Sequence, residues 1–495
     1  MASEHPQVGQ PRVGRPNRAL LVASIGIFLL TGCTGTHPSA NVPPTFPSAT
    51  RSANRPSPSA DSSPAGVAGI NTWLGYHANA ERTGAVAAGA SLAAARVAWT
   101  ADLGGAVFGQ PVVADGLVIA ATESNRVVAL NAQNGQLAWS ASLGAPLTNV
   151  ASVAGCGNID PLGITSTPVI DPATGTVYVV GEIADANGGV HHQLEGLSVT
   201  TGAVTLSENV DPPLPAGEPA VNLLQRAGLA LANGRVYIGY GGNYGDCGQY
   251  HGWLVGVEAA GPPQLVSFEV ASDGEGGAIW QSGGAPAIDA NGNLYVSTGN
   301  ANPDPPEGGP DQKSYTESVV KLSPALVPLA AFKDTVAGGD EDLSTGNPVL
   351  LPGGAVFSVG KTDIGYVLNG ASLTRAASIP DVCGSDPDGG PAYDAVTNRI
   401  FVPCRDGGIQ VVNLSTDTLG PRLQGANSAP ILIGSQLWAA QYPDGTVTEF
   451  NTATGAQMQV ISASTSIPNF ASPSTALGLL LIGTDTGVTA FTGTG

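Results

Sequence analysis

Basic residues are scarce in this 495-residue chain. Lysine and arginine together number 18, against 38 aspartates and glutamates, and the formal net charge is −20. Nucleic acids and anionic lipid surfaces attract proteins that carry basic patches, so this balance argues against both as partners. A charge far from zero also favours a soluble monomer. We therefore expect a monomeric protein that binds no nucleic acid.

Several chemical signatures are also missing. The sequence has no phosphate-binding loop, no G-x-S-x-G elbow and no H-E-x-x-H pattern. It has no C-x-x-C spacing, so zinc ligation lacks a recognisable pattern. Aromatic residues make up only 5% of the chain, and we therefore expect no broad hydrophobic binding patch. The residues by themselves favour no catalytic, metal or cofactor site.

The N-terminus has the pattern of an export signal. Arg12, Arg15 and Arg18 precede an apolar run from Ala19 to Leu30. This run is about half the length that a membrane-spanning helix needs, so we interpret it as the core of a signal peptide. It ends in Leu30-Thr31-Gly32-Cys33, which resembles a bacterial lipobox.

The lipobox resemblance implies a lipoprotein. Residues 1–32 would be removed, and Cys33 would carry lipid, palmitate included, that anchors the protein to the extracytoplasmic face of a bacterial cell membrane. The alternative is a soluble secreted protein with an ordinary cleavage site. Residues 33–66 are rich in Pro, Ser and Ala and hold few large apolar residues. Such a segment cannot bury enough surface to fold, so we expect a disordered tether.

The remaining residues, 67–495, show a repeat of short strands and tight turns. The unit is clearest from Gly116 to Trp139, GLVIAATESNRVVALNAQNGQLAW. Leu117–Ala121 and Arg126–Leu130 are apolar β runs, and Asn134-Gly135 supplies the residues that a short hairpin turn needs. With 68 glycines and 39 prolines in the chain, this pattern predicts an all-β fold.

Weaker copies of the unit recur to the C-terminus. Eight units begin near residues 110, 166, 226, 284, 346, 389, 428 and 471. Most open with a proline at the start of a strand, where a missing N–H donor is tolerated. These prolines are Pro111, Pro168, Pro286, Pro348, Pro391, Pro430 and Pro473. The spacing suits four-stranded propeller blades, so we predict an eight-bladed β-propeller, with seven blades as the alternative.

The last unit, residues 471–493, lacks an outer strand. The strand Val97–Leu103 has no unit of its own. We infer that the two combine and close the ring, which removes exposed sheet edges.

One turn pattern resembles a known repeat family. Ala129-Leu130-Asn131, Asn134-Gly135 and Trp139 are similar to the tryptophan-docking pattern of pyrroloquinoline quinone (PQQ) propeller repeats, in the quinoprotein alcohol dehydrogenase-like superfamily. Asn451, Thr454 and Gly455 repeat it with Gln459 in place of the Trp, and Thr201-Gly202 repeats it more weakly with Leu206 there. The resemblance covers about residues 97–493 and implies that the Trp packs between neighbouring blades.

Four cysteines remain besides Cys33. An even number in an exported chain suggests two disulfides. Three pairings exist for Cys156, Cys247, Cys383 and Cys404, and we favour Cys383–Cys404 with Cys156–Cys247. Metal ligation is the rival interpretation, without a supporting spacing.

The resemblance also implies candidates for chemistry. Quinoprotein alcohol dehydrogenases have a metal-binding Asn after a strand, which Asn300 matches, and a catalytic Asp in an acidic cluster, for which Asp342 is the best match. Asp246 is the candidate acidic metal ligand, although the register could instead place Cys247 there. Together with PQQ and Ca²⁺, such residues support hydride removal from an alcohol.

The sequence also departs from that family. The pair of adjacent cysteines is absent, and neither a Trp for the floor of the quinone pocket nor a basic residue to contact the quinone can be assigned. The alternative for Asp246, Asn300 and Asp342 is a structural role in loops and turns, which Asn and Asp often fill. We expect His191-His192, which follow Gly188-Gly189, to be exposed in a loop.

We therefore favour a lipid-anchored propeller that acts as a non-catalytic binding or scaffolding module at the cell envelope. Its partner would be an unidentified protein or glycan, met by the long loops Ala151–Ile164, Gly241–Gly252 and Asn300–Tyr315. One alternative is a PQQ- and Ca²⁺-dependent dehydrogenase of alcohols or sugars. Another is an envelope protein-assembly lipoprotein that adds strands to an edge.

Overall fold

The computed structural model describes residues 70–494 except 88–91, 262–263, 303–313 and 335–339. Contacts divide the chain into Met1–Pro64 and Ala65–Gly495. The predicted signal peptide, the lipidation site Cys33 and the tether 33–66 lie outside the described residues, as does most of the Asn300–Tyr315 loop. Among the described residues, no helix has the length and apolar character to cross a membrane.

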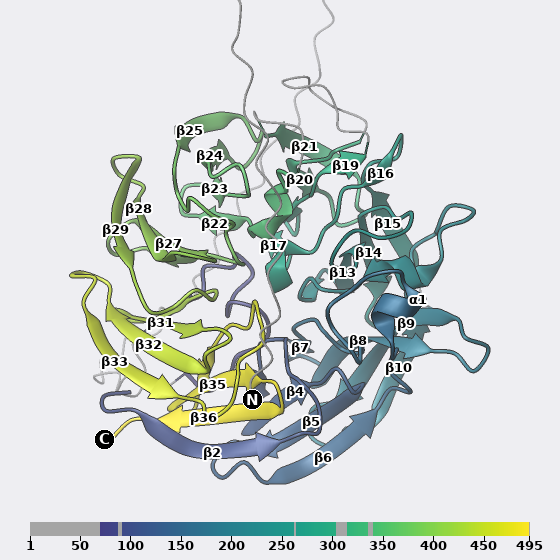
Figure 1. Ribbon diagram of the computed structural model, residues 1–495, viewed down its shortest axis with the longest axis horizontal. Coiled ribbons are helices and arrows are strands. Elements are labelled where there is room, and N and C mark those ends of the chain that lie inside the picture. Colours follow the sequence, from purple (N-terminus) through teal and green to yellow (C-terminus); the bar gives the residue numbers. More distant parts are fainter. Residues whose placement is uncertain (1–69, 88–91, 262–263, 303–313, 335–339, 495) are drawn as a thin grey trace, which may run out of the picture. The chain divides into compact units, whose positions relative to one another are not determined.

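Eight sheets, six of four strands and two of five, are arranged as a β-propeller, and each contains a four-stranded antiparallel blade (Figure 1). This confirms the predicted all-β fold and the count of eight blades. We number the blades in chain order and give their strands from the axis outward. Blade 1 is β3 (Val112–Ala114), β4 (Leu117–Ala121), β5 (Arg126–Asn131) and β6 (Leu137–Ser142); blade 2 is β7 (Val169–Asp171), β8 (Thr176–Ala184), β9 (Val190–Ser198) and β10 (Val204–Asn209). Blade 3 is β12 (Ala230–Ala232), β13 (Arg235–Gly242), β14 (Trp253–Glu258) and β15 (Leu265–Glu269); blade 4 is β17 (Ala287–Ile288), β18 (Leu294–Ser297), β20 (Ser318–Leu322) and β21 (Pro328–Lys333).

The remaining four blades have the same order of strands. Blade 5 is β22 (Val349–Leu351), β23 (Ala355–Ser358), β24 (Gly365–Asn369) and β25 (Arg375–Ile379); blade 6 is β26 (Ala392–Asp394), β27 (Arg399–Cys404), β28 (Gly408–Asn413) and β29 (Thr418–Leu423). Blade 7 is β30 (Ile431–Ile433), β31 (Gln436–Gln441), β32 (Thr446–Asn451) and β33 (Gln457–Ser462); blade 8 is β34 (Ser474–Ala476), β35 (Leu479–Thr484), β36 (Gly487–Thr492) and β2 (Arg96–Asp102). Small additions are β1 (Ala85–Val86), α1 (Val150–Val153), η1 (Ala220–Asn222), β11 (Leu223–Leu224), β16 (Glu275–Gly276), η2 (Gln281–Gly283), β19 (Ala301–Asn302) and η3 (Leu343–Thr345).

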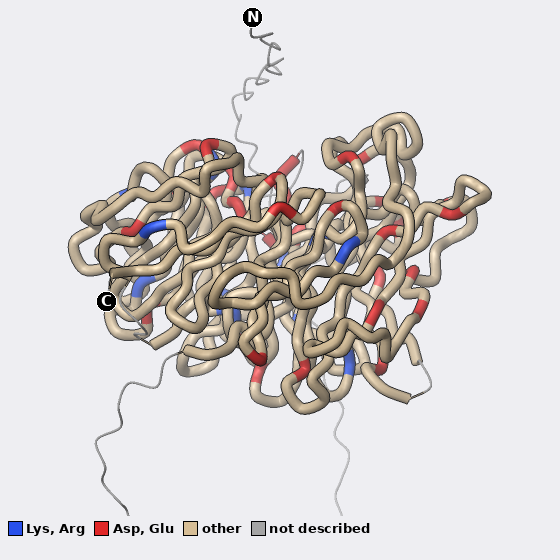
Figure 2. The backbone as a smooth tube through the Cα atoms, turned by 90° about the horizontal axis from the view of Figure 1, so that it is seen from below, with Lys and Arg blue, Asp and Glu red and all other residues tan. Residues whose placement is uncertain are grey.

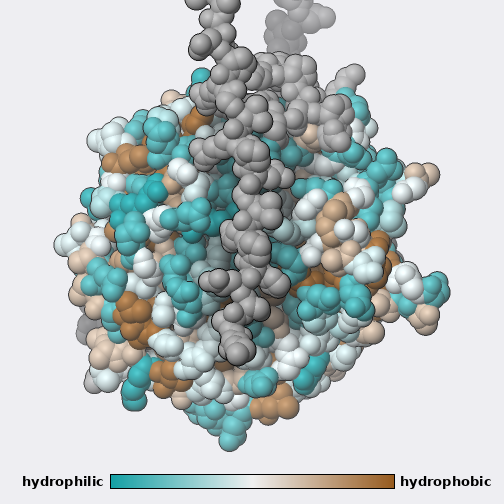
Figure 3. All heavy atoms as spheres, in the orientation of Figure 1, coloured by the Kyte–Doolittle hydropathy of each residue, from teal (hydrophilic) through white to brown (hydrophobic). Residues whose placement is uncertain are grey.

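Burial along the strands explains their composition. The second strand of each blade packs against neighbouring blades on both faces, so it is a continuous apolar run, as in β35, where every residue is buried. Outer strands such as β33 alternate between exposed and half-buried residues. Their exposed apolar side chains include Leu137, Val204 and Met458. On the face drawn in Figure 3, hydrophobic residues are scattered among hydrophilic ones.

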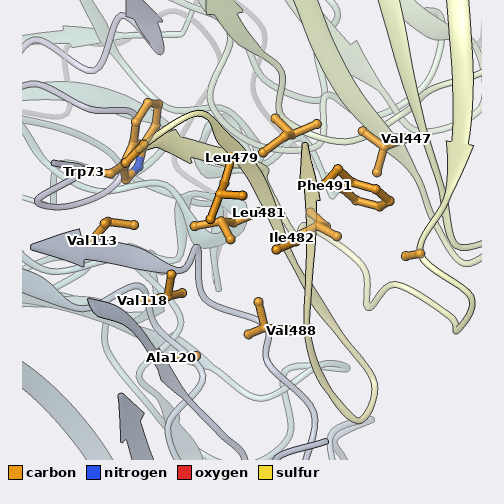
Figure 4. Packing of buried hydrophobic residues seen from close by; sticks show 14 of the residues in the cluster. Trp73, Val113, Val118, Ala120, Val447, Leu479, Leu481, Ile482, Val488 and Phe491 are labelled. Atoms are coloured by element: carbon orange, nitrogen blue, oxygen red, sulfur yellow. The ribbon is translucent and has the colours of Figure 1, made fainter. Parts of the chain in front are cut away.

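The predicted ring closure is confirmed. Strand β2, from the N-terminal part of the chain, pairs antiparallel with β36 near the C-terminus, with Asp102 opposite Gly487 (Figure 1). Blade 8 therefore combines both ends of the described chain. Its core is continuous with the adjacent blades, and Figure 4 shows Leu481 and Val488 of blade 8 in one cluster with Val118 of blade 1 and Val447 of blade 7.

The segment from residue 70 to residue 86, which we call the N-terminal segment, connects the inner strands of the ring. Its backbone carbonyls accept hydrogen bonds from the inner strand, or the turn just after it, in seven blades. The donor and acceptor pairs are Leu477 and Ile70, Val113 and Trp73, Ile170 and Leu74, Ile288 and Ala80, Leu350 and Glu81, Tyr393 and Thr83, and Leu432 and Gly84. Strand β1 then pairs parallel with β30.

The side chain of Gln110 fixes the N-terminal segment at the axis. Its Oε1 atom accepts from the indole N–H of Trp73 (2.9 Å) and from the backbone N–H of His77 (3.0 Å). Its Nε2 atom donates to the hydroxyl of Ser472 and to the carbonyl of Pro473. All four partners are satisfied by one buried amide, which therefore joins the segment to blade 8.

Tryptophan docking follows the repeat pattern. Trp99 on β2 packs on the turn at Gly135 of blade 1 and donates its indole N–H to Ala132, 2.9 Å away. Trp139 on β6 packs in the same way on Gly202 of blade 2 and donates to Val199. Gln459, which replaces this Trp in blade 7, instead donates its Nε2–H to the carbonyl of Leu92 at 2.9 Å.

Candidate functional site

Loops from different blades share one end of the ring. Strand direction alternates within a blade, so the connections between second and third strands lie at the same end as the connections from one blade to the next. Asp246 follows β13, Asn300 follows β18, and Asp342 lies between blades 4 and 5. All three therefore belong to this end, which we call the loop end.

Asp342 is a buried carboxylate with one unpaired oxygen. The side chain is 10% exposed, and Oδ2 accepts a hydrogen bond from the indole N–H of Trp280 at 3.1 Å. The ammonium group of Lys361 lies 3.9 Å from the same oxygen. Oδ1 is buried and has no hydrogen-bond partner among the described residues. It lies so close to Gly299 that a Cβ there would collide with it, which explains the glycine.

Burial raises the pKa of Asp342 to about 6. The Lys361 charge and the Trp280 hydrogen bond lower this pKa, whereas the nearby charges of Asp340 and Asp246 raise it. Asp342 is therefore a carboxyl group that is largely ionised at neutral pH and that takes up a proton just below it.

Gly299 and Asn300 adjoin this carboxylate. The N–H of Gly299 donates to Ala278 at 2.9 Å, and the carbonyl of Asn300 accepts from Gly277 at 2.7 Å. These bonds fix the strand end beside Asp342. Asn300 itself is half-buried.

Asp246 lies on the exposed rim of the same neighbourhood. Its Oδ1 atom accepts from the hydroxyl of Tyr250 at 2.6 Å. Its negative charge contributes to the raised pKa of Asp342, which places the two carboxylates within electrostatic range. The alternative ligand, Cys247, is wrong because its sulfur is bonded to Cys156. The structure thus gathers Asp246, Asn300 and Asp342 in one region.

The sequence did not identify Trp280 and Lys361, and the structure places both against Asp342. Trp280 lies in the connection between blades 3 and 4, and Lys361 in the connection between β23 and β24. The ammonium of Lys361 also pairs with Asp340. From its position in the repeat, each of these residues could have been predicted to lie at the loop end. The repeat pattern alone does not predict that they contact Asp342.

The other predicted residues have structural surroundings. The disulfides are Cys156–Cys247 and Cys383–Cys404, the pairs favoured from the sequence. The expectation of an exposed His191-His192 loop is wrong. Both residues lie on β9, and His192 is fully buried, with Nδ1 2.8 Å from Asp211. The long β8–β9 hairpin carries this strand into the contact between blades 2 and 3.

Within the described ranges, no group of three His, Cys, Asp or Glu residues is arranged to hold a metal ion. Acidic residues outnumber basic ones along the backbone trace (Figure 2). The region around Asp342 offers the carboxylates of Asp342, Asp340 and Asp246 and the side-chain amide of Asn300.

The comparisons agree with this architecture. Residues 82–304 match the model of a family described as outer membrane protein assembly factor BamB. The matched residues run from the N-terminal segment into blade 4, and over them the chain resembles the propeller repeats of that family. No curated protein matches it in sequence.

Solved structures with the same fold include quinoproteins and an assembly factor. The quinohemoprotein alcohol dehydrogenase of Comamonas testosteroni is 13% identical, with a TM-score of 0.63 over 86% of this chain and 81% of that one. A europium-containing methanol dehydrogenase is 14% identical, with a TM-score of 0.63 over 84% and 90%. BamB from Moraxella catarrhalis is 13% identical, with a TM-score of 0.53 over 80% and 99%. At these identities the likeness shows the fold alone.

Proposed function

We propose that this chain is a quinone-dependent dehydrogenase of alcohols or sugars, with its site around Asp342. The observation that supports this function is the buried Asp342 carboxylate, held by Trp280 and Lys361 beside Asn300, with one oxygen unpaired. The sequence favoured a non-catalytic module because the pair of adjacent cysteines is absent and because neither a Trp for the quinone floor nor a basic residue to contact the quinone could be assigned. Trp280 and Lys361, which lie against Asp342, are our candidates for these two residues.

The residues present fit a quinone with a bound cation. Asp342 Oδ1 is an unpaired buried oxygen among the described residues, and the nearby Asn300 carries a side-chain amide. Carboxylate and amide oxygens are the ligands that Ca²⁺ prefers. The partly exposed Trp280 offers an aromatic face, and Lys361 offers a cation. When bound, PQQ supplies a two-electron acceptor.

Asp342 is suited to act as a general base. With a pKa of about 6 it is mainly ionised at neutral pH and can accept the proton of a substrate hydroxyl. A bound quinone would supply the acceptor for the hydride that the alcohol carbon must lose to become a carbonyl compound, while Asp342 holds the hydroxyl proton. Lys361 and Trp280 both favour the ionised carboxylate, and they also fix its orientation.

Calorimetric titration of the purified chain with PQQ in the presence of Ca²⁺ or a lanthanide tests this function. We expect metal-dependent binding at micromolar concentration or tighter, lost in Asn300→Ala, and alcohol oxidation with an artificial acceptor, lost in Asp342→Asn. Asp444→Asn is the matched control, because Asp444 is exposed at the loop end in blade 7. Absence of quinone binding to the folded chain would refute the proposal.

A second candidate is a non-catalytic binding or assembly module at the cell envelope. The match of residues 82–304 to the BamB family favours it. In either case we propose an exported, lipid-anchored protein, because two disulfides suit an oxidising compartment. Mass spectrometry of the native protein, which would detect lipid on Cys33, tests the anchor.

A further inference from the structure

Arg226 is a buried cation near the axis at the loop end. Its side chain is 3% exposed and lies in the connection between blades 2 and 3. The guanidinium carbon is 5.0 Å from the centre of the Phe108 ring and 5.0 Å from that of Phe470. These rings come from the connections before and after blade 8, so three separate loops form the surroundings of one charge.

This guanidinium is poorly satisfied. Among the described residues its one hydrogen bond goes from Nη2 to the carbonyl of Asn469 at 2.9 Å, and no carboxylate lies within ion-pair distance. The other axial arginine, Arg82, donates to three carbonyls of the ring and of the N-terminal segment. Arg405 is paired with Asp386 and Asp388. Arg226 therefore has guanidinium N–H groups without a hydrogen-bond partner among the described residues, whereas Arg82 and Arg405 use more of theirs.

Burying a charge costs free energy unless an opposite charge or hydrogen bonds compensate it, and Arg226 has no carboxylate within ion-pair distance that would do so. Burial lowers the pKa of Arg226 to about 10, and the negative charge of Glu123 opposes that effect from beyond ion-pair distance. Phe108 and Phe470 are only partly buried, so solvent reaches the rings on either side of the cation. The arrangement is a cation with free donors between two accessible aromatic faces.

We propose that Arg226, Phe108 and Phe470 form a binding site for a small organic monocarboxylate with a flat apolar body. The fork of a guanidinium matches the two oxygens of a carboxylate. The aromatic rings suit a planar apolar group and contribute further attraction to the cation. Glu123 and Asp388 lie near enough to act on Arg226 electrostatically, so they would disfavour a doubly charged phosphate.

This site shares no residue with the group of Asp342, Trp280, Lys361 and Asn300, and it needs neither quinone nor metal. The two are neighbours, because the Trp280 ring meets the Phe470 ring edge-on at 5.6 Å. An acid bound at Arg226 would therefore lie beside the proposed dehydrogenase site.

Calorimetry with the purified full chain, without quinone, tests the site with benzoate as the probe. We expect benzoate to bind and to raise the melting temperature, and neutral benzamide and inorganic phosphate to bind at least tenfold more weakly. Arg226→Gln should weaken benzoate binding at least tenfold, and Phe470→Leu should weaken it severalfold. Arg235→Gln is the control, because Arg235 pairs with Glu258 on blade 3 away from the loop end.

The wild-type comparison decides the matter even where a variant fails to fold. Equal binding of benzoate and benzamide, or no binding of either, would overturn the proposal. Unchanged benzoate affinity in a folded Arg226→Gln variant would overturn it as well. Because no quinone is present, these results are independent of the dehydrogenase test.

Discussion

The indole N–H of Trp280 donates a hydrogen bond to Oδ2 of Asp342 across 3.1 Å. The two residues come from different connections, one between blades 3 and 4 and the other between blades 4 and 5. A hydrogen bond to a carboxylate favours its ionised form. The relative position of two blades thus adjusts the proton affinity of a buried acid.

Replacing Trp280 should therefore shift a pH profile. The pKa of Asp342 is about 6, and the Trp280 bond is one of the contacts that lower it. In Trp280→Phe we expect this pKa to rise, so the acidic limb of kcat/KM for alcohol oxidation moves to higher pH. Carbon-13 NMR of the Asp342 carboxyl reads the same shift without turnover. Trp139→Phe removes an indole bond to Val199 in the blade 1–blade 2 contact and should leave both curves in place.

Glu123 should make the fold less stable as the pH rises. Burial raises its pKa from 4.5 to about 7, although the Gly163 amide and the Thr165 hydroxyl lower it. Between pH 4.5 and pH 7 the folded chain holds a proton on Glu123 that the unfolded chain has released. The contribution of this group to the free energy of unfolding is therefore complete below pH 4.5 and is lost as the pH rises to 7. The loss is of the order of 3 kcal/mol.

Denaturant unfolding at pH 5 and pH 8 measures this effect. Glu123→Gln should reduce the difference between the two pH values by up to that amount, whereas Asp444→Asn should leave it unchanged. Glu182 has a pKa raised by burial and by the charge of Glu123, so its proton affinity should fall in the Glu123 variant. An undiminished pH difference in Glu123→Gln would contradict this account.

Gly135→Ala should destabilise the fold through the docked tryptophan. A Cβ at this position would stand 2.7 Å from Cδ2 of Trp99, and the residue has a φ of +70°. Gly116 has a nearly equal φ of +76° with nothing within 4 Å, so Gly116→Ala carries the backbone strain alone. We expect about 1 kcal/mol for Gly116→Ala and a further 1–3 kcal/mol for Gly135→Ala. Equal unfolding midpoints of Gly116→Ala and Gly135→Ala in guanidinium would contradict this account, because they would show that Trp99 moves aside without a cost in stability.

Gln110→Leu should release the N-terminal segment. The substitution leaves the buried donors of Trp73 and His77 and the acceptor of Pro473 unpaired, at about 1–3 kcal/mol each. We expect a loss of at least ~3 kcal/mol and faster proteolysis between residues 70 and 86. Gln133→Leu, on an exposed turn, is the control. Wild-type protease resistance in Gln110→Leu would mean that the backbone bonds hold the segment unaided.

The eight blades could be predicted from the sequence because their signals are local. Each of the seven prolines that open a repeat unit comes directly before an inner strand. The conformation of each tight turn depends on the residues within that turn. The closure of β2 on β36 followed from counting strands. The N-terminal segment could not be predicted, because its bonds follow no strand periodicity and reach residues such as Leu432, far along the chain. Trp280, Lys361 and Arg226 meet their neighbours only through the geometry of the ring.

The pairing of β2 with β36 has a consequence for the order in which the protein is made. The segment 70–102 leaves the ribosome before every blade that it contacts, and its last partner strand ends at Thr492. Strand β2 must therefore stay without its partner until nearly the whole chain has been synthesised. Contacts this distant in sequence slow folding. A chain that stops before residue 487 would retain seven blades and two unmatched edges.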